Sequence, residues 1–525
     1  MQQLLRPPEI QSVSQPRAAE ASSLPWLPGA LAAIIALATY GVTIGGTYIY
    51  DDVQIVTVDP RIKDPHQWKY LWTKDYFNGG LDNLYRPLVS QSYAFEWWLH
   101  GDKPWAFHLV NILLAAAVAA LVAELARRLW GWKVGMIAGV LFAAHPVHSE
   151  VVAGIVGRAE LMCGLGIVGA MILFLHKPMT IPRAWAIGAL SVLAMLSKEQ
   201  GLLMPLLLAI LLPLREATDS AERRPMRVLA ILLLWSVSGL IVLREEILKL
   251  HFAWERSLLD FTIQPMIRST GSDRWLMPVV LVGHYLQLLL APIHLSIDYG
   301  YAVMGWKVDL ADPYLYAGFF AIAAWIALAI FTLYRRRWNA LFCLLALAIT
   351  YSMASNIVLI ATNFAERLIY IPSIFFIILI SAALAHLPRR IGTAVVMLLL
   401  ALCLLRTITY VSRWNNRHDF YAYELEQQPR SIRLMMLLSY EDYSSGDLDS
   451  ARKLMADACA IPPDYEQTWQ FAGEIEEKAG NWATALADYR KAFKIQHNGV
   501  MDKKIGEMQI KIAEQNPSTQ PSSAP

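Results

Sequence analysis

The sequence predicts an all-α polytopic membrane protein with a C-terminal helical solenoid, and three observations support this fold class. Hydrophobic residues make up 56% of the 525 residues and charged residues only 17%, which is too little charge to cover a soluble protein of this length. Apolar runs as long as a membrane span recur through most of the chain. A sequence repeat with the length of a helix pair then follows in the polar C-terminal part.

The N-terminal 24 residues contain Gln, Ser, Pro and mixed charges without apolar periodicity, which predicts a disordered cytoplasmic tail, 1–24. The apolar run after it is longer than the core of a signal peptide, so we expect a retained membrane-spanning helix. Together with ten later runs it predicts about eleven spans within a transmembrane domain, 25–412. The runs lie near 25–49, 105–127, 133–152, 156–176, 183–198, 200–214, 226–243, 313–334, 338–360, 364–386 and 389–410.

The loops that carry Lys and Arg predict the orientation of the spans, because cations beside a span are retained in the cytoplasm. These loops alternate correctly if the N-terminus is cytoplasmic. They contain Arg127, Arg128 and Lys133; Lys177 and Arg183; Arg215, Arg223, Arg224 and Arg227; Arg335–Arg337; and Arg389 with Arg390. The segment 275–292 is also apolar, but a crossing there would break the alternation. We therefore expect a re-entrant or interfacial helix on the outer side.

The polar part after residue 413 contains a repeat. Gly446, Ala451 and Ala458 recur as Gly480, Ala485 and Ala492, a spacing of 34 residues each time, which is the period of a tetratricopeptide (TPR) helix pair. Small residues at these positions allow close helix packing. We expect an extracytoplasmic TPR domain at 413–513, with two repeats and a capping helix, that holds an extended peptide. An unrelated helical bundle is the alternative, and 514–525 is predicted to be a disordered tail.

The first outer loop, about 50–105, is long and rich in aromatic residues, and it begins with Tyr50-Asp51-Asp52. Consecutive helical residues point about 100° apart, so one carboxylate can face a cavity while the other is tied to a neighbour. A carboxylate placed in this way can take a proton from an attacking hydroxyl. The alternative is a pair of solvated acids at a helix exit.

A second polar group, His145, His148 and Glu150, lies at the outer end of the third span. Two imidazoles and a carboxylate could ligate a divalent ion. Pro146 interrupts the helix between the histidines, so we favour hydrogen-bonding histidines and expect no metal site. The four cysteines are scattered and predict neither a disulfide framework nor structural zinc.

Four cations lie on the predicted outer side: Arg86, Arg158, Lys198 and Arg367. The rule that cations beside a span stay in the cytoplasm does not account for cations on that side. This placement suits an anionic group such as a lipid phosphate. Structural pairing with the nearby acids is equally compatible with the pattern; these acids include Asp51, Asp52, Glu150, Glu160, Glu199 and Glu366. The net charge of +2 and the absence of a basic run give no support for nucleic-acid binding.

Several stretches resemble the transmembrane and tetratricopeptide-repeat-containing (TMTC) proteins, which are protein O-mannosyltransferase-like members of the GT-C glycosyltransferases. The matching stretches are Tyr50-Asp51-Asp52, Tyr85 to Leu88 (YRPL), Phe107 to Asn111 (FHLVN), His145 to Leu161 (HPVHSEVVAGIVGRAEL), Ser197 to Gly201 (SKEQG), Asp298-Tyr299 and Ala365 to Ser373 (AERLIYIPS). The long run from His145 is the most specific of them.

The resemblance implies a GT-C fold and an inverting transfer of mannose from a polyprenyl-phosphate sugar to Ser or Thr of extracytoplasmic proteins, without a cofactor. It implies a general base within Asp51-Asp52 and a donor phosphate bound by Arg367, then Arg158 and Arg86, with Glu366 beside them. The sugar or acceptor would be oriented by His145, His148, Glu150, Glu160, Lys198 and Glu199.

Other readings stay open at this stage. Another lipid-linked sugar or a glycan or lipid acceptor would keep the fold, and a non-catalytic membrane scaffold would use the spans only to hold the repeats. A transporter fits less well, because the polar groups gather at one face and not at mid-membrane. Short loops and the short repeat array favour a bacterial inner membrane over the endoplasmic reticulum.

Overall fold

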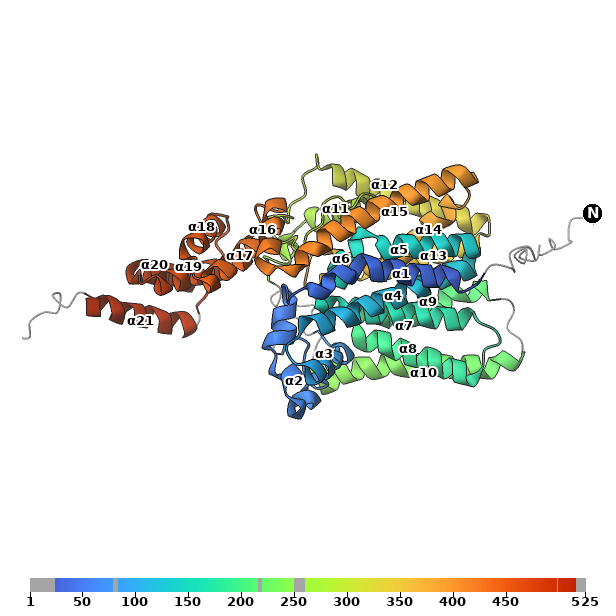
Figure 1. Cartoon of the computed structure of the whole chain (residues 1–525), viewed down its shortest axis with the longest axis horizontal. Coiled ribbons are helices and arrows are strands. Elements are labelled where there is room, and N and C mark those ends of the chain that lie inside the picture. The colour runs from blue at the N-terminus through green and yellow to red at the C-terminus, as the bar shows by residue number, and fades with distance from the viewer. Residues whose placement is uncertain (1–23, 79–83, 216–219, 250–259, 498, 516–525) are drawn as a thin grey trace, which may run out of the picture.

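The fold is described from a computed structural model, which places residues 24–78, 84–215, 220–249, 260–497 and 499–515. Within these ranges every regular element is a helix. Figure 1 shows the apolar helices running side by side in a bundle, while the helices that follow residue 417 project from one end of it. The all-α membrane fold expected from the sequence is confirmed.

Seven helical segments of the described chain are long and apolar enough to cross a membrane. They are Leu27–Gly45, which contains α1 (Leu27–Tyr40); α4 (Pro104–Trp130); Ile155–Leu175, which contains α7 (Arg158–Leu175); Ser220–Glu245, which contains α10 (Arg223–Val242); α12 (Pro313–Tyr334); Glu366–Leu384, which contains α14 (Tyr370–Leu384); and Arg389–Asn415, which contains α15 (Arg389–Val411).

An eighth crossing is formed if α5 (Trp132–Ala144) and the segment Pro146–Ala153, which includes α6 (Ser149–Ala153), count as one bent span. The two parts are bent by 53°, and the bend lies at His145-Pro146. Proline causes such a bend because it lacks an amide proton and its ring clashes with the preceding turn.

The three remaining predicted spans correspond to apolar helices of 10–17 residues. They are α8 (Ile181–Ser197), the segment Glu199–Leu214 with α9 (Met204–Leu211), and α13 (Trp338–Ser352). The expected span 338–360 is too long, because the helix ends at Ser352 and the chain then becomes irregular, with Asn356 at a φ of +53°.

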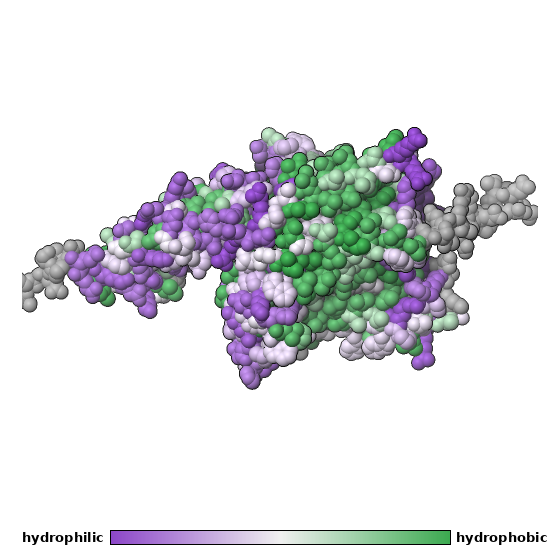
Figure 2. All heavy atoms as spheres, viewed as in Figure 1, coloured by the Kyte–Doolittle hydropathy of each residue, from purple (hydrophilic) through white to green (hydrophobic). Residues whose placement is uncertain are grey.

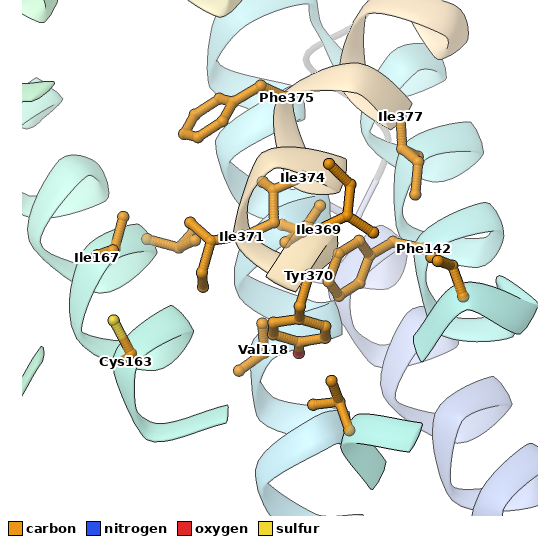
Figure 3. Packing of buried hydrophobic residues seen from close by; sticks show 14 of the residues in the cluster. Val118, Phe142, Cys163, Ile167, Ile369, Tyr370, Ile371, Ile374, Phe375 and Ile377 are labelled. Carbon is orange, nitrogen blue, oxygen red and sulfur yellow. The ribbon is translucent and has the colours of Figure 1, made fainter. Parts of the chain in front are cut away.

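The centre of the bundle is formed by α4, α7 and α14, whose residues are mostly buried, whereas α10, α12 and α15 are mostly exposed. In Figure 3, α14 contributes apolar side chains that pack between α4, α5 and α7. The labelled residues there are Ile369, Tyr370, Ile371, Ile374, Phe375 and Ile377 with Val118, Phe142, Cys163 and Ile167. Figure 2 shows a hydrophobic band between two polar ends. Such a surface is stable against lipid, so the chain is an integral membrane protein.

The loops rich in Lys and Arg meet at one end of the bundle. Lys133 donates from Nζ to the carbonyl of Ala385 at 2.6 Å, and Arg128 donates to the carbonyl of Ile172 at 3.4 Å. Arg215 caps the carbonyl of Phe174. These contacts join loops that are far apart in sequence and were predicted to share one side of the membrane.

The helix α11 (Asp273–Leu290) covers the segment predicted to be re-entrant or interfacial. It packs closely on α12, since a Cβ at Gly283 or Gly318 would lie only 2.0 or 1.9 Å from a backbone oxygen of the partner helix. It is not one of the seven segments that meet the criteria for a span. Its relation to the bilayer stays a prediction.

The first outer loop folds into α2 (Pro60–Lys63), a 3₁₀ turn (Pro65–Leu71) and α3 (Pro87–His100), which share a small core of their own. Arg61 and Asp59 form a buried ion pair at 2.6 Å inside it. Leu71 is buried in this core, and Trp68 packs against it.

The C-terminal part consists of α16 (Arg417–Gln427), α17 (Ile432–Ser445), α18 (Leu448–Cys459), α19 (Glu466–Lys478), α20 (Trp482–Ile495) and α21 (Gly499–Gln515). Gly446 and Gly480 both adopt a positive φ, +93° and +79°, where the first helix of each pair ends. Ala451, Ala458, Ala485 and Ala492, the small residues of the repeat, are all buried. The repeat therefore recurs in the structure, while its assignment as a TPR solenoid and the domain boundaries stay predictions.

Candidate active site

Asp52 is fixed inside the protein. Its side chain is fully buried, and its two carboxylate oxygens accept the amide N–H groups of Ile49 at 3.2 Å and Val156 at 2.9 Å. Burial raises the pKa of Asp52 to about 7, against the opposing effect of these amides. Asp52 therefore ties the chain that leaves α1 to the start of α7.

Asp51 points to a different environment, as the sequence predicted for one member of the pair. Its carboxylate is 20% exposed and lies between two guanidinium groups: Oδ1 is 3.5 Å from Nη2 of Arg433, and Oδ2 is 4.0 Å from Nη2 of Arg367. Neither contact is a short hydrogen bond. The carboxylate is thus held by charge and remains accessible, which suits a group that must meet a substrate.

Arg367 links Asp51 to the end of α6. Its Nη1 forms an ion pair with Glu150, and its amide N–H donates to the other oxygen of Glu150 at 2.9 Å. Within the described chain, its Nε and Nη2 form no hydrogen bond. Arg367 is 24% exposed and retains donors that can meet an anion.

Glu366 binds a different part of the chain. It is fully buried, and its Oε1 accepts from the amide of Ser296 at 2.8 Å and the hydroxyl of Tyr299 at 2.9 Å. Its Oε2 has no hydrogen-bond partner among the described residues. These contacts attach the segment before α14 to the loop that contains Asp298-Tyr299. The role of Glu366 beside the donor phosphate stays a prediction.

His145 and His148 bind the protein through all four ring nitrogens. His145 contacts the carbonyl of Leu289 at 3.2 Å and accepts from the amide of Val147 at 3.3 Å. His148 contacts the carbonyl of Phe142 at 2.9 Å and the hydroxyl of Ser373 at 2.8 Å. The two rings therefore hold the bent span against α11 and α14. The role predicted for them at the sugar would be indirect.

Two further ion pairs lie at the same end of the bundle. Arg86 pairs with Glu199 at 2.9 Å, and Lys198 pairs with Glu160 in a nearly buried contact. Glu160 acts electrostatically on both Arg86 and Arg367, which places this second cluster beside the first. The roles predicted for these four residues stay predictions.

Arg158 is fully buried and surrounded by partners. It forms an ion pair with Glu96 and donates to Asn111 at 2.9 Å, Ser92 at 3.1 Å and the carbonyl of Phe107 at 3.0 Å. These contacts use every nitrogen of the guanidinium group. The structure therefore places Arg158 in the packing between α3, α4 and α7, and its predicted role at the donor phosphate stays a prediction.

The C-terminal part contributes two residues that the sequence did not indicate. Arg433, near the start of α17, reaches Asp51 and stacks on the ring of Tyr50 with its guanidinium carbon 4.3 Å from the centroid. Tyr421 of α16 accepts the amide N–H of Tyr50 at 2.9 Å. Both residues lie more than 370 positions from their partners, and no motif or periodicity marks them.

Within the described ranges, no group of three or more His, Cys, Asp or Glu side chains is arranged to hold a metal ion. The residues that the sequence offered as ligands, His145, His148 and Glu150, are engaged with other parts of the protein. Asp51 itself lies beside two guanidinium groups, those of Arg367 and Arg433.

No family model matches the chain. The curated "Protein O-mannosyl-transferase tmtc2" of Xenopus laevis is 32% identical over 186 residues, which cover 33% of this chain and 22% of that protein. "Protein O-mannosyl-transferase TMTC3" of Homo sapiens is 24% identical over 460 residues, which cover 79% of this chain and 49% of that protein. The resemblance to the TMTC proteins is confirmed.

The chain thus spans about a fifth of the length of the Xenopus TMTC relative and about half of the human one. Among solved structures, ArnT from Cupriavidus metallidurans in the apo state is 16% identical with a TM-score of 0.44. That alignment covers 93% of this chain and 88% of the other.

Proposed function

We propose that this chain is a membrane glycosyltransferase that moves a sugar, mannose, from a polyprenyl-phosphate donor to Ser or Thr hydroxyls of proteins outside the cytoplasm. The observation that carries the proposal is the accessible Asp51 carboxylate, held between Arg367 and Arg433 at the end of the bundle away from the basic loops. The names of the TMTC relatives support the choice of sugar and acceptor.

Asp51 acts as the general base in this proposal. It accepts the proton of the acceptor hydroxyl while the hydroxyl oxygen forms a bond to the anomeric carbon of the sugar. The bond from that carbon to the phosphate oxygen breaks, and its electron pair leaves with the polyprenyl phosphate. Attack on the face opposite the leaving phosphate inverts the anomeric configuration.

Arg367 stabilises the charge that grows on the departing phosphate. Its Nε and Nη2 are the donors left over after the pair with Glu150, and Nη2 is 4.0 Å from Asp51. A single well-placed donor of this kind lowers a barrier by about 3–4 kcal/mol. Arg86, which is also partly exposed, is the second candidate for contact with the donor.

The acceptor polypeptide approaches along the C-terminal helices, which share the Asp51 end of the bundle through Arg433 and Tyr421. We place this end outside the cytoplasm, in agreement with the basic loops at the other end. A bacterial inner membrane is the location that we favour, and the endoplasmic reticulum is the alternative. We expect no divalent metal to be required.

Mass spectrometry of extracytoplasmic proteins tests the function directly. Cells that lack the gene are complemented with the wild type, with Asp51→Asn, or with Asp449→Asn, a change at an exposed acid on α18. We expect hexose on Ser and Thr with the wild type and Asp449→Asn, and its loss with Asp51→Asn. A scaffold would leave Asp51→Asn indistinguishable from the wild type, and a glycan or lipid acceptor would leave proteins unmodified in every strain.

A further inference from the structure

The backbone beside the candidate base is held in an unfavourable conformation by the C-terminal helices. Tyr50 has a φ of +61°, which a residue with a bulky side chain rarely adopts. Its amide N–H is bound by Tyr421, and its ring is covered by the guanidinium of Arg433. The conformation that presents Asp51 therefore depends on contacts from α16 and α17.

Arg433 also lines a groove beside α17. The groove has a volume of about 500 Å³ and lies between α17, the residues around the start of α19 and the segment 260–263. The wall is fixed by Tyr465, whose hydroxyl donates to Asp260 at 2.8 Å, and by Phe261, whose ring meets Tyr465 edge to face. Arg433 is thus shared between the groove and Asp51.

The lining of the groove fits an extended polypeptide better than a sugar or a phosphate. Apolar and aromatic side chains form most of it, and among the described lining residues Arg433 is the one cation and Asp260 the one acid. The apolar and aromatic members include Ile263, Ile432, Met436, Leu437, Tyr440, Tyr465 and Phe471. Thr262 and Gln467 add hydrogen-bonding groups. Such a lining suits apolar side chains on either side of a reacting Ser or Thr.

We propose that this groove binds the segment of the acceptor polypeptide next to the reacting hydroxyl, and that Arg433 is a positioning residue that couples the groove to Asp51. A peptide in the groove contacts one side of Arg433, and the other side of Arg433 holds Tyr50 and Asp51 in place. The C-terminal helices thereby set the geometry of the base as well as the affinity for the acceptor. This inference rests on the proposed function.

The test uses the full-length protein in nanodiscs with polyprenyl-phosphate mannose and a synthetic peptide that carries one Ser or Thr between apolar residues. Because a misplacement of about 1 Å can cost a factor of 100, we expect Arg433→Met to lower kcat by about 10- to 100-fold, with the KM for the donor unchanged. Arg433→Lys restores part of kcat, since it keeps the charge. Met436→Glu raises the KM for the peptide and leaves kcat nearly unchanged.

Arg452→Met is the matched control, because Arg452 pairs with Glu476 at 2.5 Å within the repeat helices and does not contact Asp51. Hydrogen exchange gives a readout that needs no activity: the amides of residues 49–52 lose protection in Arg433→Met and keep it in Arg452→Met. An unchanged kcat in Arg433→Met, or unchanged protection, overturns the coupling. An unchanged peptide KM in Met436→Glu overturns the groove.

The two proposals fail in different ways. If the wild type transfers no sugar to any peptide, the proposed function is wrong, and the exchange of residues 49–52 still decides whether Arg433 positions Asp51. If the wild type is active and Arg433→Met matches it in kcat and in exchange, the proposed function stands and the coupling is wrong.

Discussion

The two neighbouring aspartates are expected to respond in opposite ways to the same change, because they differ in burial and in hydrogen bonding. In Asp51→Asn, the side chain loses contacts of 3.5 and 4.0 Å at a partly exposed site. Exposed pairs of this kind contribute about 1 kcal/mol or less to stability. Loss of the base, by contrast, lowers the transfer rate by about 10²- to 10⁴-fold.

Asp52→Asn has the reverse effect. Both oxygens of Asp52 accept backbone amides, at 3.2 and 2.9 Å, in a fully buried site. Asparagine offers only one carbonyl oxygen, so one amide loses its partner and faces the new NH₂ group. An unsatisfied buried amide costs about 1–3 kcal/mol, so we expect this much loss in the free energy of unfolding below the raised pKa of Asp52, where the wild type carries no buried charge.

The assay measures both quantities on the same preparations. Thermal unfolding of protein in nanodiscs gives stability, and transfer to a Ser- or Thr-containing peptide is divided by the amount of folded protein. We expect Asp51→Asn to be stable and inactive, and Asp52→Asn to be destabilised and active per folded molecule. An active Asp51→Asn, or a stable but inactive Asp52→Asn, would refute the assignment of the base.

Four further outcomes are expected. The pKa of Asp52 rises from 3.8 to about 7 on folding, so between these pH values the folded state keeps a proton that the unfolded chain releases. The free energy of unfolding should therefore fall by about 4 kcal/mol at most as the pH increases through this range. Chemical denaturation of the wild type at several pH values measures this fall, and Asp52→Asn should abolish it. Glu96→Gln leaves Arg158 buried without its ion pair, so unfolding in nanodiscs should show a loss of about 3–5 kcal/mol, and wild-type stability would contradict the structural role of Arg158. Arg367→Ala should raise the KM for the donor lipid more than the KM for the peptide in steady-state assays, and an equal rise in both would count against contact with the phosphate. Transfer should persist in EDTA, and activity that is lost in the chelator and restored by Mn²⁺ or Mg²⁺ would show that a metal is needed.

Hydropathy predicted where the apolar helices of the bundle lie, because a span has a length fixed by the bilayer, but three of the eleven expected spans are shorter helices. It could not predict how the short helices end. The limit of α13 at Ser352 depends on an irregular segment, and the bend between α5 and α6 depends on one proline. Both are local features, and a hydropathy value averaged over the length of a span does not show them.

The candidate site was predictable in part. The sequence indicated that one carboxylate of the Asp51-Asp52 pair is tied to a neighbour, but it could not say which one, since the tie to Asp52 is the amide of Val156. It grouped Arg367 with the Asp51-Asp52 pair, and Nη2 of Arg367 lies 4.0 Å from Asp51. It grouped Arg158 with them as well, but could not show that Glu96 and Asn111 already bind this residue. Arg433 carried no signal, because its contact with Asp51 depends only on how the C-terminal helices dock on the bundle.

The stereochemistry of transfer by the purified protein tests the central claim most directly. The protein is supplied with polyprenyl-phosphate mannose of known anomeric configuration and a Ser- or Thr-containing peptide, and NMR of the glycopeptide gives the configuration of the product. A base at Asp51 opposite a phosphate at Arg367 predicts an inverted sugar on the hydroxyl and no product with Asp51→Asn. Retention of configuration, or transfer that survives Asp51→Asn, would contradict it.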